Sequence, residues 1–502
     1  MLFRSPDVTA IVGQARAVEA IDFAMAMPGQ GYNLLVMGPA GIGKHTAINQ
    51  YLDREATRRP VPDDWCYVHN FADPRRPRAL RLPPGRGRAL RARMAALVRE
   101  FTTSIPAAME GDDYRTRRLA LEEAFKTRRD AAMNALQEKA MAQGVAIAQT
   151  PMGFGMAAVR NGEVVDPEAF AKLPAEEQAR VRLAMAALEG ELAQLLATFP
   201  RWEREHRRDV QALNEETVRR AVDQVVADAR GEFGDLPAVI AFLDEVESDV
   251  VARAGEFLRR GGEEGDGPVT PGHSDGGVPG GLLAGAGPAV DGSSPFGRCQ
   301  VNLIVDNGEL QAAPVVHEDL PTHPNLLGQV EQVAHLGALV TDFTLIKAGA
   351  LHRANGGYLV LDVRRLISQP YAWEELKRAL RSRELRVDRL PQGVLWLATA
   401  SIEPEAIPLD VKVVLTGDRE LFLLLAQLDP DLEELFRIRA DFDDRAIRTP
   451  EAERLYAAVL GTIARREGLR PLDAGACAAV IDHAARLADH ADRLRSEEHT
   501  SE

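Results

Sequence analysis

Short apolar runs and amphipathic stretches follow one another over the first part of the chain. The runs Tyr32–Gly38 (YNLLVMG) and Trp65–Phe71 (WCYVHNF) are typical of buried strands, and Ala10–Met27 places Ala, Val, Ile and Phe on one helical face. Buried strands of this type suit a parallel sheet that helices cover. The pattern therefore predicts the first part of an α/β subdomain over residues 1–85.

Residues 86–260 carry a different pattern, with apolar residues at three- and four-residue spacing among many Glu, Arg, Ala and Leu residues. These are good helix formers and offer charge pairs one turn apart. Between two such stretches, Gly144–Val165 is rich in β-branched residues and contains the turn signal Asn161-Gly162. We expect a long α-helical (coiled-coil) insertion with a hairpin tip. It is either a spacer or a protruding arm whose apolar tip touches substrate or gates access.

Residues 261–297 are dominated by Gly, Pro and Ser. Such a segment buries too little apolar surface to offset its ordering entropy, so we expect a disordered loop. Strand-like runs return between residues 298 and 440, which predicts the second part of the α/β subdomain. They are Arg298–Asn307, Gly356–Leu366, Val394–Ile402 and Val411–Asp418. Two amphipathic stretches within residues 441–494 then predict a small all-α lid.

The composition narrows the class of protein. The chain has 502 residues and a net charge of -15, which argues against a nucleic-acid partner because phosphate binding needs a basic face. The basic stretch Arg75–Arg93 is interpreted as a solvated turn or as a face that contacts an acidic neighbour. The three cysteines lie far apart, and no apolar run approaches the roughly 18 residues of a membrane span. We expect a cytoplasmic protein without a membrane partner.

The strongest chemical signal is a phosphate-binding loop of the form G-x-x-x-x-G-K, with a predicted strand before it and a helix after it. Its residues are Gly38, Pro39, Ala40, Gly41, Ile42, Gly43 and Lys44. Backbone N–H groups of such a loop surround phosphate oxygens, and the following helix adds its positive end. Lys44 supplies a charge to the terminal phosphates. The pattern predicts binding of ATP with Mg²⁺.

The residue after the lysine departs from this pattern. A hydroxyl normally binds Mg²⁺ there, but the chain has His45, and imidazole is a poor ligand for this hard ion. Thr46 lies one residue later, about 100° further around the helix, and is expected to reach the α-phosphate. We expect His45 to weaken metal positioning and to leave nucleotide binding intact.

Asp362, Asp418 and Arg437 complete the predicted site. Asp362 follows the apolar strand Tyr358–Leu361 and is expected to hold Mg²⁺ directly or through water. Val363 stands where hydrolytic engines of this architecture usually carry a Glu, and it cannot act as a base. Asp418, after another strand, could orient the attacking water, and Arg437 could reach a neighbouring subunit's γ-phosphate. For Asp418 and Arg437 the alternatives are a strand-end turn and a surface ion pair.

One motif between the insertion and Asp362 has two interpretations. Asn325–Gly328 (NLLG) contains an apolar pair followed by glycine. Such a segment suits a loop that grips an unfolded chain in a central pore. The alternative is a buried turn.

Several long segments resemble the Lon-related group of ATP-dependent proteases of bacteria. They include GYNLLVMGPAGIGKHT, QTPMGFGMAAV, APVVHEDLPTHPNLLGQVEQ and GALVTDFTLIKAGALHRANGGYLVLD, and the resemblance covers nearly the whole chain. It implies an AAA+ module interrupted by a helical insertion, ring-shaped homohexamers and protein substrates that are unfolded or damaged. It implies nucleotide-site roles for Gly38, Gly43, Lys44, Thr46 and Asp362, and it places Ile11–Gln14 beside the adenine.

The resemblance also implies a C-terminal serine protease domain with a Ser nucleophile and a Lys partner. Those residues are expected beyond position 502, so no catalytic residue is assigned. Arg495–Glu502 (RSEEHTSE) resembles in-frame translation of a DNA-sequencing adaptor, and we hypothesise an artificially truncated fragment. The leading interpretation is the ATP-binding, substrate-handling portion of a Lon-like protease. A nucleotide-binding scaffold or gating ring and a chaperone-like unfoldase are the alternatives.

Overall fold

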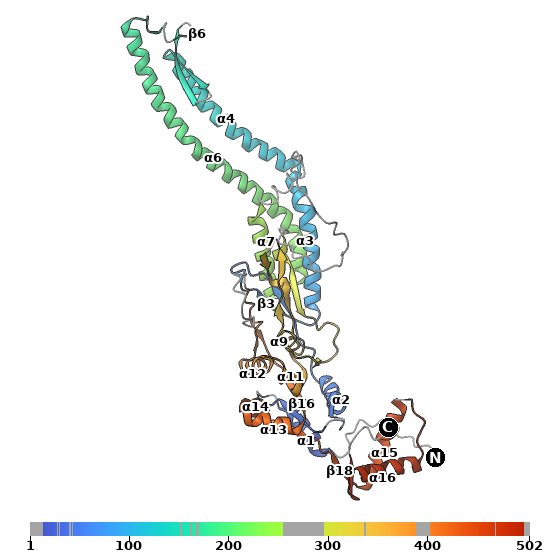
Figure 1. Cartoon of the computed structure of the whole chain (residues 1–502). Coiled ribbons are helices and arrows are strands. Elements are labelled where there is room, and N and C mark those ends of the chain that lie inside the picture. The colour runs from blue at the N-terminus through green and yellow to red at the C-terminus, as the bar shows by residue number, and fades with distance from the viewer. Residues whose placement is uncertain are drawn as a thin grey trace, which may run out of the picture. The chain divides into compact units, whose positions relative to one another are not determined.

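A computed structural model gives the fold (Figure 1). It describes residues 14–27, 29, 31–39, 42, 44–150, 153–160, 163–166, 170–254, 296–335, 338–387, 402–466 and 468–495. The chain forms two compact units. The first contains Met1–Ala95, Ala289–Gly292 and Gly297–Glu502, and the second contains Ala96–Pro288 and Ser293–Phe296.

A five-stranded parallel sheet forms the centre of the first unit. Its order is β17 (Ile438–Asp441), β1 (Leu34–Met37), β16 (Lys412–Gly417), β13 (Tyr358–Asp362) and β8 (Val315–Glu318). Strand β1, the first in the chain, therefore lies between β16 and β17, which come last in sequence among the strands of this sheet. This arrangement confirms the predicted α/β class with a parallel sheet.

Side chains alternate along each strand, so the apolar strands place buried side chains on both faces of the sheet. Helices cover both faces. Leu34 and Val36 pack with α1 (Ala15–Ala26) and α2 (Lys44–Ala56). Leu35 and Met37 belong to the cluster on the other face, which includes residues of several helices. These helices are α9 (His323–Leu327), α10 (Ala350–Arg353), α11 (Val363–Ser368), α12 (Ala372–Ser382), α13 (Arg419–Leu428) and α14 (Asp431–Leu435).

The predicted strand at Trp65–Phe71 lies in a different sheet from the one expected. β2 (Asp64–Val68) pairs antiparallel with β3 (Arg78–Leu82) and with β7 (Val301–Val305). The prediction of a parallel partner was wrong because β3 follows β2 after a short connection, which permits antiparallel pairing at once. The strand itself was correctly predicted from its buried side chains.

The basic stretch Arg75–Arg93 supplies β3 and the first turns of α3 (Arg86–Glu110). Arg81 donates to Asp63 over 2.5 Å. Arg88 donates to Asp306 over 2.8 Å and to Glu309 over 2.7 Å. The prediction that this basic segment contacts acidic neighbours is confirmed at these two arginines.

The second unit is dominated by long helices, α4 (Asp112–Ala142), α6 (Ala175–Glu232) and α7 (Pro237–Ala252). Figure 1 shows α4 and α6 running side by side. They are antiparallel, since Tyr114 near the start of α4 donates to Asn214 over 2.8 Å, whereas Lys139 near its end donates to Glu191 over 2.6 Å.

The predicted hairpin follows α4. β4 (Val145–Thr150) pairs antiparallel with β5 (Gly153–Arg160), which pairs with β6 (Glu163–Val164). Arg160 lies opposite Glu163. The turn predicted at Asn161-Gly162 lies outside the described residues. The loop predicted at 261–297 and the strand predicted at 394–402 lie mainly outside the described residues.

The segment Asn325–Gly328 is a buried turn rather than an exposed loop. Leu326 and Leu327 are buried in the core next to the parallel sheet, and Thr322 caps the short helix α9 by accepting from the N–H of Asn325. Gly328 ends the helix with φ of 90°, a conformation that favours glycine. The hypothesis of a substrate-gripping loop was therefore wrong here, because burial removes both leucines from any substrate.

Short strands complete the first unit. They are β9 (Gln329–Val330), β10 (Val333–His335), β11 (Ala338–Val340), β12 (Ile346–Lys347), β14 (Glu384–Leu385) and β15 (Ile407–Pro408). Near the C-terminus, α15 (Pro450–Arg466) and α16 (Ala474–Leu487) share a small core. The strands on either side of these helices, β18 (Arg445–Ile447) and β19 (Arg493–Arg495), pair antiparallel. The predicted tail lies outside the described residues from position 496 onward. None of the described helices is long and apolar enough to cross a membrane.

Candidate nucleotide-binding site

Three strand ends meet at the carboxyl edge of the parallel sheet. Met37 lies opposite Gly417, and Asp362 lies opposite Thr416. The N–H of Gly38 donates to the carbonyl of Gly417 over 3.3 Å. The glycine loop, Asp362 and Asp418 therefore leave the sheet at adjacent positions, as the sequence predicted. Ligands of open parallel sheets bind at this edge.

The start of the loop leaves little room for a side chain. A Cβ atom at position 38 would lie 3.0 Å from Cβ of Phe442, the residue that follows β17. Ile42 is buried with the residues of α1 and α2, whereas Pro39 is exposed. Ala40, Gly41 and Gly43 lie outside the described residues, so their predicted contacts with phosphate stay predictions.

Lys44 is the first residue of α2, and only 6% of its surface is exposed. Its Nζ donates to the carbonyl of Gly38 over 2.6 Å and to that of Pro39 over 3.2 Å. The Asp418 Oδ1 atom lies 3.8 Å from the same nitrogen. Burial lowers the pKa of Lys44, and the charges of Asp418 and Asp362 oppose this effect. The ammonium is thus held at the loop by two carbonyls and one carboxylate.

Asp418 connects Lys44 to a residue that the sequence did not single out. Arg364 donates from Nη2 to the Asp418 Oδ2 atom over 3.0 Å. Asp418 therefore stands between two cations, with one carboxylate oxygen towards each. Arg364 follows directly after Val363 in the acidic strand motif, and nothing in the sequence pattern distinguishes it from other surface arginines.

Asp362 ends β13 and begins α11. Its Oδ1 atom accepts from the N–H of Arg365 over 3.0 Å, which is the geometry of a helix N-cap. This bond partly satisfies Oδ1, and the second carboxylate oxygen accepts from no backbone N–H of the described residues. Mg²⁺ in nucleotide sites is held by one or two carboxylates together with the phosphates. Asp362 fits that role, and no cluster of three or more His, Cys, Asp or Glu residues exists in the described part of the chain.

Val363 points into the core rather than into the site. It is fully buried in the cluster beneath the sheet, and its Cγ1 atom occupies the space that a side chain at Gly417 would need. The residue was predicted to be unable to act as a base. The structure adds that a longer polar side chain at this position would meet the apolar interior.

His45 lies on the exposed side of α2, next to Lys44. Partial desolvation lowers the pKa of His45, and the charge of Lys44 lowers it further. The charge of Asp362 raises this pKa to a smaller extent. The neutral imidazole is therefore favoured. Thr46 is half-buried one residue later. Its predicted contact with an α-phosphate stays a prediction.

Of the segment Ile11–Gln14, only Gln14 lies within the described residues. Its side chain donates to the carbonyl of Asp443 over 2.7 Å and accepts from the N–H of Asp443 over 2.9 Å. Asp443 follows Phe442, which packs against Gly38. Gln14 therefore fastens the segment after β17 next to the glycine loop.

Arg437 is at the opposite edge of the sheet from Lys44. It precedes β17, and its guanidinium lies 5.6 Å from the ring centre of Tyr32. Its Nε donates to the carbonyl of Glu434 over 3.2 Å. The length of β17, at about 3.3 Å per residue, separates Arg437 from the glycine loop of its own chain. The predicted role of Arg437 towards a neighbouring subunit's nucleotide stays a prediction.

Comparison with known proteins gives two family matches. The LonB-like AAA domain matches residues 311–443, and the Lon-like LonC helical domain matches residues 64–97. The first match contains Asp362, Asp418 and Arg437, and the glycine loop precedes both matches. Residues 311–443 are therefore similar to a LonB-like AAA domain, and the parallel sheet is consistent with an AAA-type fold.

A curated relative points in the same direction. The "Putative Lon protease homolog" of Escherichia coli (strain K12) is 35% identical over 108 residues, which are 20% of this chain and 17% of that protein. The chain is therefore Lon-related, as its motifs indicated. The aligned part spans less than a fifth of that relative's length.

Two solved structures of NtrX from Brucella abortus, one in complex with ADP, also align. Their TM-scores are 0.23 and 0.22, and their identities are 17% and 18%. Each alignment covers 34% of this chain, and 36% and 35% of the respective NtrX chains.

Proposed function

We propose that this chain is the ATP-binding portion of a Lon-like ATP-dependent protease, and that it binds Mg·ATP at the loop Gly38–Thr46. The observation that carries the proposal is the placement of Lys44, whose ammonium lies at the carboxyl edge of the sheet near Asp418 and Asp362. A buried cation beside a glycine loop and two strand-end carboxylates suits a triphosphate with its metal.

Each residue then has a role that follows from its position. Lys44 exchanges the carbonyls of Gly38 and Pro39 for β- and γ-phosphate oxygens. Thr46 would contact the α-phosphate, and Asp362 would hold Mg²⁺. The metal, when bound, neutralises charge on the phosphates. Asp418 positions the attacking water, because it is the carboxylate nearest to Lys44.

The site has fewer of the groups needed for ATP hydrolysis than of those needed for ATP binding. His45 offers no hydroxyl to the metal, and Val363 is buried in the core. Asp418 is the remaining carboxylate that could accept a proton from water, but it already bonds Arg364. We therefore propose slow turnover on a site that binds nucleotide well.

Assembly and substrate handling belong to the same proposal. Arg437 faces away from its own loop, so a homohexameric ring would place it beside a neighbour's γ-phosphate. For protein substrates, the hairpin of β10 and β11 exposes Val333 and Leu339 to solvent, and it replaces Asn325–Gly328 as the proposed contact. Peptide-bond hydrolysis is assigned to a Ser-Lys dyad that we do not place in this chain.

The test is Mg·ATP binding and steady-state ATPase of the chain and of Lys44→Ala, with Lys172→Ala as the matched control. Lys172 is an exposed lysine in the second unit. We expect Lys44→Ala to weaken binding at least tenfold and Lys172→Ala to leave it unchanged. Equal binding by the parent and Lys44→Ala would refute the site. Tight binding without turnover in the parent would favour a scaffold or gating ring.

A further inference from the structure

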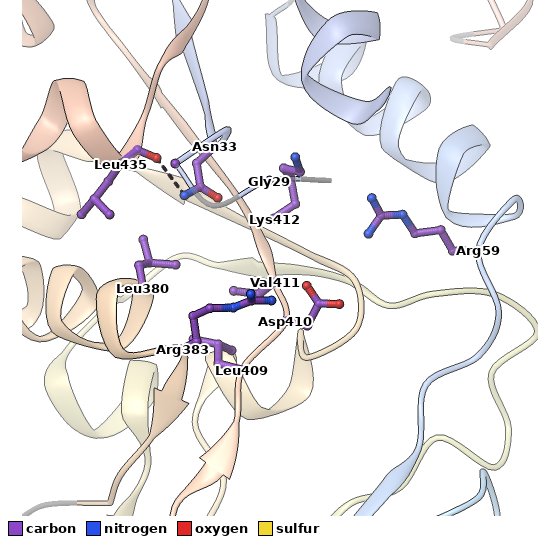
Figure 2. A pocket seen from close by; sticks show the side chains of 11 residues that line it. Gly29, Asn33, Arg59, Leu380, Arg383, Leu409, Asp410, Val411, Lys412 and Leu435 are labelled. Carbon is purple, nitrogen blue, oxygen red and sulfur yellow. Dashed lines mark hydrogen bonds between the residues drawn. The ribbon is translucent and has the colours of Figure 1, made fainter. Parts of the chain in front are cut away.

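A cavity of about 290 Å³ lies at the amino-terminal edge of the parallel sheet, where β1 and β16 begin. Figure 2 shows its lining. The side chains that matter are Asn33, Arg59, Leu380, Arg383, Asp410 and Lys412. Lys44 and the glycine loop leave the opposite edge, so this cavity is separate from the nucleotide site.

The lining carries an excess of positive charge. Arg59, Arg383 and Lys412 oppose one carboxylate, that of Asp410. The guanidinium of Arg59 stacks on the ring of Tyr358, 4.8 Å from its centre. Within the described part of the chain, no ion pair joins Arg59 or Arg383 to a carboxylate. The two guanidinium groups therefore retain N–H donors for a ligand.

Lys412 contributes charge without offering a donor. Its Nζ already donates to the carbonyls of Ala24, Met27 and Tyr32, at 2.8, 2.7 and 3.1 Å. These three bonds use all three ammonium protons. Lys412 is buried, so its charge is poorly screened and acts on whatever occupies the cavity. The donors for a ligand must come from the arginines.

The backbone of Arg383 gives a second, independent indication. Arg383 ends α12 in the left-handed region, with φ of 55° and ψ of 34°. This position at a helix end favours glycine or asparagine, and other residues occupy it at a cost in strain. Its backbone is fixed on both sides, because its N–H donates to Ala379 and its carbonyl accepts from Leu409. An arginine is held in an unfavourable conformation at the mouth of a cationic cavity.

We propose that this cavity binds a phosphate dianion, supplied by inorganic phosphate or by a small phosphorylated molecule. A tetrahedral dianion can accept from the guanidinium forks of Arg59 and Arg383 at once. Its charge balances the two net positive charges of the lining. A cavity of about 290 Å³ holds more than the phosphate group alone. A wider hollow of about 710 Å³ shares Arg59, Arg383 and Asp410 and can take an organic part.

The bound anion would connect three elements that line the cavity. Arg59 follows the end of α2, Arg383 follows α12, and Lys412 begins β16. Figure 2 shows Arg59 approaching the cavity from the opposite side to Arg383. Binding is therefore expected to stabilise the fold as well as to be saturable.

The test uses the full chain carrying Lys44→Ala, so that phosphate at the glycine loop does not contribute. Inorganic phosphate is titrated by calorimetry at constant ionic strength. We expect saturable binding that Arg59→Gln weakens at least tenfold. Arg383→Gly should weaken it as much while leaving the melting temperature unchanged or higher, because glycine relieves the left-handed backbone. Arg58→Gln, next to Arg59 but paired with Glu55, should change nothing.

Unchanged phosphate binding in Arg383→Gly and Arg59→Gln would overturn the proposal, and so would acetate binding as tightly as phosphate. A second titration with ribose 5-phosphate separates the sources. Tighter binding than inorganic phosphate identifies a phosphorylated molecule as the ligand, and weaker binding identifies the free ion. Because these variants leave the glycine loop in place when made in the parent chain, Mg·ATP binding measured there reports on the nucleotide site separately.

Discussion

Val363 packs its Cγ1 atom against Gly417, so the residue after the acidic strand and the end of the neighbouring strand interlock inside the core. This contact decides what position 363 can do. Introducing Val363→Glu to supply the missing base should fail. The carboxylate would be buried without a partner, at a cost of about 3–5 kcal/mol in the free energy of unfolding.

Urea unfolding and ATPase rates check this prediction. Val363→Ile, which keeps the site apolar but adds a methylene, should cost only about 1–3 kcal/mol. A Val363→Glu chain that unfolds at the parent's urea concentration and hydrolyses ATP faster would show that the side chain reaches the nucleotide instead of the core.

Asp418 should separate nucleotide binding from turnover. The substitution Asp418→Asn removes a negative charge 3.8 Å from the Lys44 ammonium, which leaves Lys44 freer to attract phosphates. We expect ATP affinity to rise a few-fold, and turnover to fall about 10²-fold because the water loses its acceptor.

Equilibrium binding of a fluorescent ATP analogue and phosphate-release kinetics measure the two effects of Asp418→Asn. Asp482→Asn is the matched control, since Asp482 also pairs with an arginine, Arg448, but lies in α16. Weaker ATP binding in Asp418→Asn, with turnover maintained, would assign this carboxylate to ligand binding only.

Asp64 is expected to be the most sensitive carboxylate for stability in the first unit. It is fully buried and accepts from the N–H of Gly87 over 2.9 Å, at the start of α3, and from the N–H of Asn307 over 2.7 Å. Asp64→Ala leaves both donors unsatisfied and should cost about 2–4 kcal/mol. Asp63→Ala, at the half-exposed neighbour, should cost less than about 1 kcal/mol. Chemical denaturation compares them, and equal losses would contradict the prediction.

His352 should make the fold sensitive to acid. Its Nδ1 atom accepts from the N–H of Gly349 over 3.3 Å, and its buried Nε2 atom has no hydrogen-bond partner among the described residues. Burial lowers the pKa of His352 from 6.5 to about 4. The unfolded chain takes up the proton first as the pH falls. Stability contributed by His352 is therefore complete above pH 6.5 and is lost progressively towards pH 4, by on the order of 3 kcal/mol.

Unfolding free energies measured between pH 7 and pH 4 check the role of His352. His352→Asn keeps an acceptor for Gly349 and should flatten this part of the profile. His483→Asn, at an exposed histidine, should leave the profile as in the parent. A profile that is equally steep in His352→Asn would place the acid sensitivity elsewhere.

The strands of the parallel sheet were predictable because their signal is local. Leu34–Met37 and Val413–Leu415 are apolar at successive positions, as burial on both faces requires. Their order in the sheet was not predictable, since it depends on contacts between residues hundreds of positions apart. For the same reason Trp65–Val68 was recognised as a strand but assigned to the wrong type of sheet.

The candidate site shows the same division. Lys44, Asp362 and Asp418 follow strands, and the rule that parallel strands end at one edge brings them together. Arg364 was missed because a surface arginine has no pattern of its own. The prediction of a substrate-gripping loop at Leu326 and Leu327 was wrong, since an apolar pair before glycine has the same sequence pattern in a loop and in a buried helical turn.

The bonds from Lys44 to the carbonyls of Gly38 and Pro39 have a kinetic consequence. These bonds hold the ammonium of Lys44 on the loop itself. A triphosphate can bind Lys44 only after the bonds to the two carbonyls break. Occupation of the site is then an exchange of partners rather than a simple capture. The observed rate of nucleotide binding should be limited by how often Lys44 leaves the two carbonyls. It should therefore level off as the nucleotide concentration rises.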